Sequence, residues 1–246
     1  MRSPRTAPVT AAEVPGHRSS KRVAALVTAV VVLATSTTLA NRVLPGWAYP
    51  VCGLVAAAIL VALGRAAGCT WTDLGLGTLR RPALVGLAGA GLVAVVFGIA
   101  LAVPALRTVY QDGRVGDPDF GQLLWLTCGR ILFGTVLIEE VAFRGVLPGL
   151  LGATDDRWRW PPILGAAALF GLWHALPALA IGRNAAVHAV FGATPVVVLQ
   201  VLAMAAAGVA GIFLHWWRHA GRGVLASVIV HFTTNAGGLT LAVLVR

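Results

Sequence analysis

Apolar residues are grouped along the chain in runs that are long enough to cross a bilayer. A membrane-spanning helix needs about 20 predominantly apolar residues, whereas a surface helix of a soluble protein is interrupted by a polar face. Pro and Gly mark the breaks between the runs. We therefore predict an all-α fold, a polytopic transmembrane helical bundle of about seven spans, over residues 23–40, 47–64, 83–103, 122–150, 162–181, 195–217 and 224–245.

The composition agrees with a membrane protein. Of the 246 residues, 58% are hydrophobic and 11% are charged, whereas soluble domains carry roughly 25% charged residues. The net charge of +10 lies mostly in the connections between apolar runs, where basic residues set orientation and meet anionic headgroups. No basic helix or aromatic-interleaved patch favours nucleic acid as a partner. We expect a disordered cytoplasmic arm over 1–22, N-terminal transmembrane helices over 23–110 and a core over 122–246.

The basic residues also predict the orientation. With the N-terminus inside, twelve Lys and Arg residues fall in inside segments and five in outside segments, which favours a cytoplasmic N-terminus and an odd number of spans. The basic residues before the first run resemble those of a signal peptide. Because further apolar runs follow, an uncleaved first helix is favoured, and cleavage after Ala40 is the alternative.

Three charged residues interrupt the run 122–150, namely Glu139, Glu140 and Arg144. Each such charge costs about 2.5 kcal/mol or more near the centre of a membrane helix, so these side chains should face the bundle interior and serve a function. Glu140 and Arg144 are four residues apart, share a helix face and can pair. Glu139 points about 100° away and lacks that cation. A desolvated carboxylate of this kind suits a general base.

Two further runs carry polar residues at a similar depth. His174 ends the motif Phe170-Gly-Leu-Trp-His174, and His231 lies four residues before Asn235 on one helix face. Counted from the predicted inner ends of the helices, all of these residues lie ~10–18 Å below the inner surface. A buried ion network is the structural alternative for the acidic motif alone. The match in depth instead favours one shared site.

These three motifs, Glu139-Glu140-x-x-x-Arg144, Phe170-x-x-x-His174 and His231-x-x-x-Asn235, resemble those of the CPBP family. This family comprises the CAAX-prenyl-protease and bacteriocin-processing (Abi) intramembrane proteins. All three motifs are intact and in the family's order over roughly residues 122–240. The resemblance implies a multi-helix core around a cavity and hydrolysis of a peptide bond within the membrane.

The resemblance also implies roles for the motif residues. Glu139 would activate the attacking water with help from His174, and His231 and Asn235 would stabilise the developing oxyanion. Glu140 and Arg144 would position the first carboxylate, and Phe170 would support the site by packing.

The metal requirement stays open at this point. Glu139, His174 and His231 form a plausible Zn²⁺ set with an open fourth position, and a metal-free glutamate mechanism fits equally well.

The function predicted from these observations is an intramembrane endopeptidase that acts on a membrane-associated or lipidated peptide or protein. Two alternatives are a non-catalytic membrane scaffold for binding or immunity and a proton-coupled transporter that uses Glu139 and Glu140. The transporter gains no support from internal repeats, because none is visible. A composition rich in Arg, Ala, Val and Gly points to a bacterial cytoplasmic membrane.

The remaining candidate ligands lack a site pattern. Cys52, Cys69 and Cys128 form no C-x-x-C pair and are expected to behave as small apolar residues. The acidic loop that contains Asp112, Asp117 and Asp119 has no recognisable calcium-ligand spacing. We expect a solvated loop there.

Overall fold

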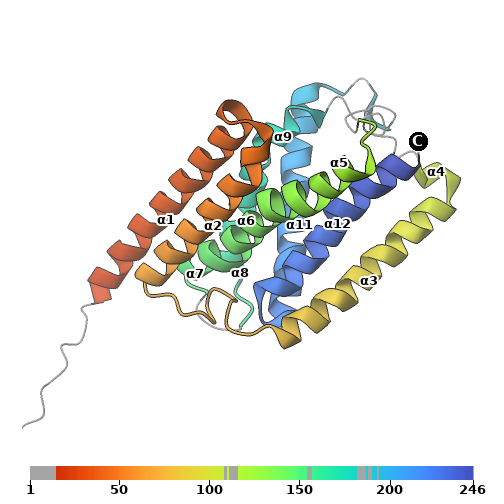
Figure 1. Cartoon of the computed structure of the whole chain (residues 1–246). Coiled ribbons are helices and arrows are strands. Elements are labelled where there is room, and N and C mark those ends of the chain that lie inside the picture. The colour runs from red at the N-terminus through yellow and green to blue at the C-terminus, as the bar shows by residue number, and fades with distance from the viewer. Residues whose placement is uncertain are drawn as a thin grey trace, which may run out of the picture.

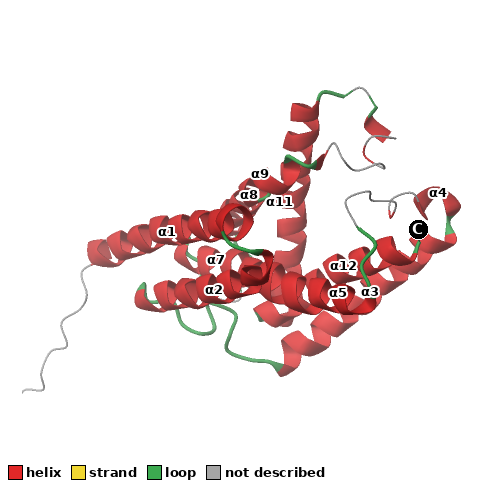
Figure 2. Cartoon of the chain, turned by 45° about the horizontal axis from the view of Figure 1, so that its top comes forward, coloured by secondary structure: helices red, strands yellow, loops and turns green. Residues whose placement is uncertain are grey.

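The computed structural model describes residues 15–107, 110, 116–153, 157–181, 187, 190–192 and 194–245. Within these ranges the chain is helical or in short connections, and no strand is present (Figures 1 and 2). The prediction of an all-α membrane bundle is therefore confirmed. Asp112 and His188 lie outside the described residues.

The long helices correspond to the predicted apolar runs, and several short helices lie between them. They are α1 Pro15–Thr38, α2 Tyr49–Ala66, α3 Arg80–Ala102, α4 Pro104–Arg107, α5 Phe120–Leu124, α6 Leu137–Glu140, α7 Leu147–Leu150, α8 Trp160–Trp173, α9 Ala175–Ala178, α11 Val196–Gly221 and α12 Val224–Leu244. Wider turns of π type over Trp125–Val136 (η4) and Val141–Val146 (η5) join α5, α6 and α7 into one continuous helical segment, Phe120–Leu150.

Six helical segments of the described chain are long and apolar enough to cross a membrane, and Trp160–Trp173 is a shorter apolar helix. The predicted run 162–181 is therefore not one continuous helix. Its helix ends at Trp173, and α9 begins at Ala175. Pro177 explains the break, because a proline ring clashes with the carbonyl group four residues earlier, which here belongs to Trp173.

The first helix begins earlier than the apolar run. α1 starts at Pro15, so residues 15–22 of the predicted arm are helical. Proline is well tolerated in the first turn of a helix because its missing N–H would have had no partner. The basic residues that follow Pro15 therefore extend the apolar helix by about two turns.

Helices that are distant in sequence pack in pairs. α1 lies beside α2, α3 lies beside α12, and α11 contacts α8, with the segment Phe120–Leu150 between α2 and α12 (Figure 1). Small residues permit close approaches between these helices. A Cβ atom on Gly89 would lie 2.5 Å from Val230, and one on Gly171 would lie 2.7 Å from the Met204 carbonyl oxygen. Gly98, by contrast, faces open space.

The structure also places the three cysteines and Asp119. Cys52, Cys69 and Cys128 are free thiols, and Cys69, in the connection after α2, is 1% exposed. Burial raises the pKa of the Cys69 thiol. Asp119 caps α5, because its carboxylate accepts a hydrogen bond from the Gln122 N–H and the Gln122 side chain accepts one from the Asp119 N–H.

Candidate active site

Glu139 and Glu140 occupy the single α-type turn α6, between the two π-type segments η4 and η5. Both carboxylates are buried, with exposed fractions of 4% and 0%. π-type turns are rare and are frequent at functional sites. The widened turns on either side set the direction in which the adjacent carboxylates leave the helix.

Two side chains, Arg144 and His231, lie against the same oxygen of Glu140. Arg144 Nη1 lies 3.3 Å from Glu140 Oε1, as the spacing of four residues predicts. His231 Nδ1, from α12, donates a hydrogen bond of 2.7 Å to the same oxygen. Arg144 is 1% exposed. This buried triad ties the segment Phe120–Leu150 to α12.

Glu139 has a different environment. Its Oε1 accepts a hydrogen bond of 2.8 Å from the Trp173 indole N–H, at the end of α8. Its Oε2 is buried, receives no hydrogen bond from any described residue, and lies 3.8 Å from His231 Nε2. One oxygen of Glu139 is thus fixed, and the other keeps lone pairs available for a proton.

Asn235 completes the cluster on α12. Its Nδ2 lies 3.1 Å from His231 Nε2. Because an amide N–H donates and a carboxylate accepts, this bond leaves the proton of His231 on Nδ1, where it faces Glu140. Both ring nitrogens of His231 are thus engaged by side chains.

The Phe170 ring packs near two histidine rings and one guanidinium of the site. Its ring lies 4.5 Å from the His174 ring and 6.4 Å from the His231 ring, measured between centroids. The Arg144 guanidinium lies 4.1 Å from its centroid, which is within range of a cation–π interaction. The packing role predicted for Phe170 therefore extends to the charged network.

The structure brings Glu139, Glu140, Arg144, His231 and Asn235 into one contiguous cluster. His174 lies at its edge: its Nδ1 is 2.8 Å from the Phe170 carbonyl oxygen, and no hydrogen bond or ion pair within the described chain joins its ring to Glu139. The break of the helix at His174 accounts for this, because the side chain leaves from the turn between α8 and α9 and not from a continuous helix face.

Of the predicted zinc set, Glu139 and His231 approach each other, with Oε2 and Nε2 3.8 Å apart, and His174 lies at the edge of the cluster. Within the described ranges, no three His, Cys, Asp or Glu side chains are arranged to hold a metal ion. Both nitrogens of His231 already face other side chains, Glu140 and Asn235. A zinc ion would require His231 to exchange one of these partners for the metal.

Trp173 is the site residue to which the sequence analysis gave no role. It stands inside the motif Phe170-x-x-x-His174, next to the histidine. A usable signal was present, because the N–H of a tryptophan within an apolar helix normally needs an acceptor. Its ring also packs against Phe143, at 5.9 Å between centroids.

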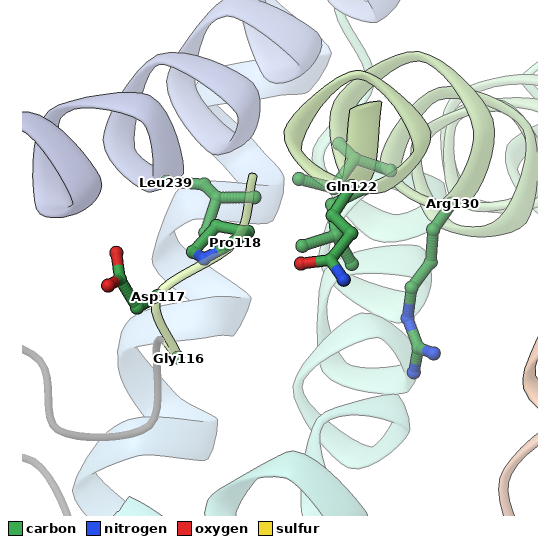
Figure 3. Close-up of a pocket in the computed structure, with 8 residues that line it drawn as sticks. Gly116, Asp117, Pro118, Gln122, Arg130 and Leu239 are labelled. Atoms are coloured by element: carbon green, nitrogen blue, oxygen red, sulfur yellow. The ribbon is translucent and has the colours of Figure 1, made fainter. Parts of the chain in front are cut away.

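A pocket of about 440 Å³ lies between the segment Phe120–Leu150 and α12, toward the C-terminal end of α12 (Figure 3). Arg130, Gln122 and Leu239 line it, and the Arg130 guanidinium lies 4.4 Å from the Tyr49 ring centroid. No predicted site residue lines this pocket. Leu239 follows Asn235 by one helical turn, which separates the pocket from the carboxylate cluster.

A comparison with protein families identifies the core. The model described as type II CAAX prenyl endopeptidase Rce1-like matches residues 121–237, a range that includes every residue of the cluster. Over these residues the chain is similar to that family. Neither a curated protein nor a solved structure matches the chain.

The Rce1-like core connects the structure with a known chemistry. The family consists of endopeptidases, so the core is of a protease type that hydrolyses peptide bonds. The six candidate spans place it in a multi-pass integral membrane protein. The carboxylates of Glu139 and Glu140 lie about two thirds of the way along the helical segment Phe120–Leu150.

Proposed function

We propose that the protein is an intramembrane endopeptidase that cleaves a membrane-associated or lipidated peptide or protein, with Glu139 as the base that activates water. The observation that supports this role best is that the two carboxylate oxygens of Glu139 have different environments. Trp173 fixes Oε1, and the buried Oε2 remains available 3.8 Å from His231 Nε2. A positioned carboxylate of this kind is suited to general-base catalysis.

The proposed reaction needs only water and the protein. Glu139 Oε2 takes a proton from water while the water oxygen forms a bond to the scissile carbonyl carbon. Asn235, with His231 behind it, donates a hydrogen bond to the resulting oxyanion, an interaction worth about 3–4 kcal/mol in comparable sites. The C–N bond then breaks, and the proton held by Glu139 passes to the departing amine. His174 assists at the edge of the site.

A direct role for zinc would need a rearrangement of these residues. If Zn²⁺ binds, Glu139, His174 and His231 are the donors available, and the ion would supply Lewis-acid chemistry. The hydrogen bonds of His231 to Glu140 and Asn235 favour the metal-free form of the proposal.

An apolar groove supports the choice of a lipidated substrate. The groove, of about 270 Å³, lies between α1 and the helices α8 and α9. Phe143 and Trp173 line its wall together with Leu33 and Leu172. Because the Trp173 N–H contacts Glu139, a lipid chain in this groove would end beside the proposed catalytic carboxylate.

The proposal can be tested with the purified full-length chain in detergent or nanodiscs. The substrate would be a fluorogenic peptide with a farnesylated cysteine three residues from its C-terminus, compared with the same peptide without the lipid. We expect cleavage of the lipidated peptide by the wild type and loss of cleavage in Glu139→Gln. Equal cleavage by the two proteins would contradict the assignment of Glu139.

The same experiment separates the enzyme from a binding scaffold. A scaffold would retain the farnesylated peptide without cleaving it, and Glu139→Gln would bind as the wild type does. Mass spectrometry of the peptide after incubation distinguishes cleavage from retention, because only hydrolysis adds one water across the two products.

A further inference from the structure

A second pocket, of about 650 Å³, lies at the opposite end of α12 from the pocket of Figure 3. It is formed where α3 begins and where α11 turns into α12, two segments that lie together in Figure 1. We call it the arginine pocket. The residues that line it are Thr72, Thr78, Arg80, Arg81, Leu84, Val85 and Arg222.

The arginine pocket is strongly basic. Three of its lining residues are arginines, and none is acidic. Arg81 joins the two segments, because its Nε and Nη2 donate hydrogen bonds of 3.3 Å and 3.1 Å to the Ala220 carbonyl oxygen. α3 and α12 start here and α11 ends here, so the positive ends of two helix dipoles and the negative end of one lie in this region. These features together favour an anion.

Arg222 has an unusual backbone conformation for its residue type. With φ 58° and ψ 34° it adopts the left-handed conformation at the C-cap of α11, and it is the one non-glycine residue with positive φ within the described ranges. Glycine is the usual residue at such a position. The chain has Gly221 and Gly223 on either side but an arginine at the left-handed position itself.

The arginine pocket also has an apolar side. Leu84 lies one helical turn after Arg80 on α3, is 61% exposed, and lines the pocket together with Val85. Next to Thr72, Trp71 is 51% exposed with the Arg65 guanidinium 4.8 Å from its ring centroid. Exposed tryptophans of this kind mark the depth of the lipid headgroups.

From these contacts we propose that the arginine pocket binds the phosphate headgroup of an anionic phospholipid, in the leaflet at which α3 begins. The arginines would hold the phosphate, and Leu84 with Val85 would contact the first carbons of the acyl chains. A free phosphate ion would use only the polar half of the pocket. The lipid uses both halves, and its binding is a property separate from peptide hydrolysis.

The test measures lipid binding to the full-length chain by native mass spectrometry from detergent, with phosphatidylglycerol, phosphatidylcholine or inorganic phosphate added at equal ionic strength. The informative variant is Arg80→Gln combined with Arg222→Gly. Glycine suits the left-handed conformation of residue 222, so this variant should melt at the temperature of the wild type or above. The matched control is Arg42→Gln, because Arg42 is an exposed arginine just after the C-terminal end of α1 and does not line the arginine pocket.

We expect the wild type and Arg42→Gln to retain phosphatidylglycerol in preference to phosphatidylcholine. The double variant should lose at least tenfold in affinity for phosphatidylglycerol, and Arg222→Lys should keep most of it. Two results would overturn the proposal: equal phosphatidylglycerol binding by the double variant and the wild type, or displacement of the lipid by millimolar inorganic phosphate.

Discussion

His231 Nδ1 lies 2.7 Å from Glu140 Oε1, so the histidine from α12 is bound to the second carboxylate of the acidic pair and not to the first. Glu140 Oε1 thereby contacts both His231 and Arg144, whereas Glu139 Oε1 accepts a hydrogen bond from the neutral indole of Trp173. The second oxygen of each glutamate is buried without a hydrogen bond from the described residues. Under the proposed function, Glu140 would organise the helices and Glu139 would carry the chemistry.

This division predicts different results for the two charge-removing substitutions. Glu139→Gln should lower kcat for the farnesylated peptide by about 10²–10⁴-fold, the usual contribution of a general base, with little change in melting temperature. Glu140→Gln should lower the melting temperature, because Arg144 would lose its partner in a buried position. Activity and thermal unfolding measured on the same preparations would separate the two effects. Similar thermal destabilisation of both variants would contradict the division.

Trp173 provides a test that leaves the acidic residues intact. Trp173→Phe keeps an aromatic ring against Phe143 but removes the N–H that contacts Glu139. A hydrogen bond to a charged group contributes about 1.5–3 kcal/mol, so we expect kcat to fall by at least tenfold. Trp216→Phe, at an exposed tryptophan on α11, is the control. Unchanged kcat in Trp173→Phe would show that Glu139 does not depend on the indole.

The sequence predicts the helices and most of the cluster, because charges in apolar runs are costly and must face one another. The spacing of Glu140 and Arg144, and that of His231 and Asn235, places each pair on one face, and the structure shows both contacts. Spacing within one helix cannot predict which glutamate His231 binds, since that depends on the rotation of α12 against α6.

Two features of the site depend on deviations from a regular helix. The break before Pro177 moves His174 away from the face that a continuous helix would give it. The π-type turns η4 and η5 change the direction of the side chains around α6. The proline was visible in the sequence and predicts the break, whereas no local signal identifies the wider turns.

Arg144 should contribute strongly to stability. It is buried, pairs with Glu140 and stacks on Phe170. Removal of one partner from a buried ion pair costs about 3–5 kcal/mol, so Arg144→Met should lower the unfolding free energy by this order. The double variant Arg144→Met with Glu140→Gln should be less destabilised than the sum of the single variants. Additive effects in thermal unfolding would show that the pair is not energetically coupled.

Treatment with a chelator tests the metal-free form of the mechanism. Because both nitrogens of His231 are engaged by side chains, we expect cleavage of the farnesylated peptide to survive dialysis against EDTA, with less than a twofold change in kcat. Metal analysis of the dialysed protein would accompany the assay. Loss of activity on dialysis and its recovery with Zn²⁺ would instead support the set Glu139, His174 and His231 as ligands.

The packing of α3 against α12 can be tested with two glycines on one helix. A Cβ atom on Gly89 would lie 2.5 Å from Val230 and 2.9 Å from the Trp217 ring, whereas one on Gly98 would meet no atom within 4 Å. Gly89→Ala should therefore destabilise the protein by about 1–3 kcal/mol through overpacking. Gly98→Ala should be neutral or slightly stabilising, because alanine favours the helix. Because α12 carries His231 and Asn235, Gly89→Ala should also lower kcat, and equal stability and activity of the two variants would show that this contact does not position α12.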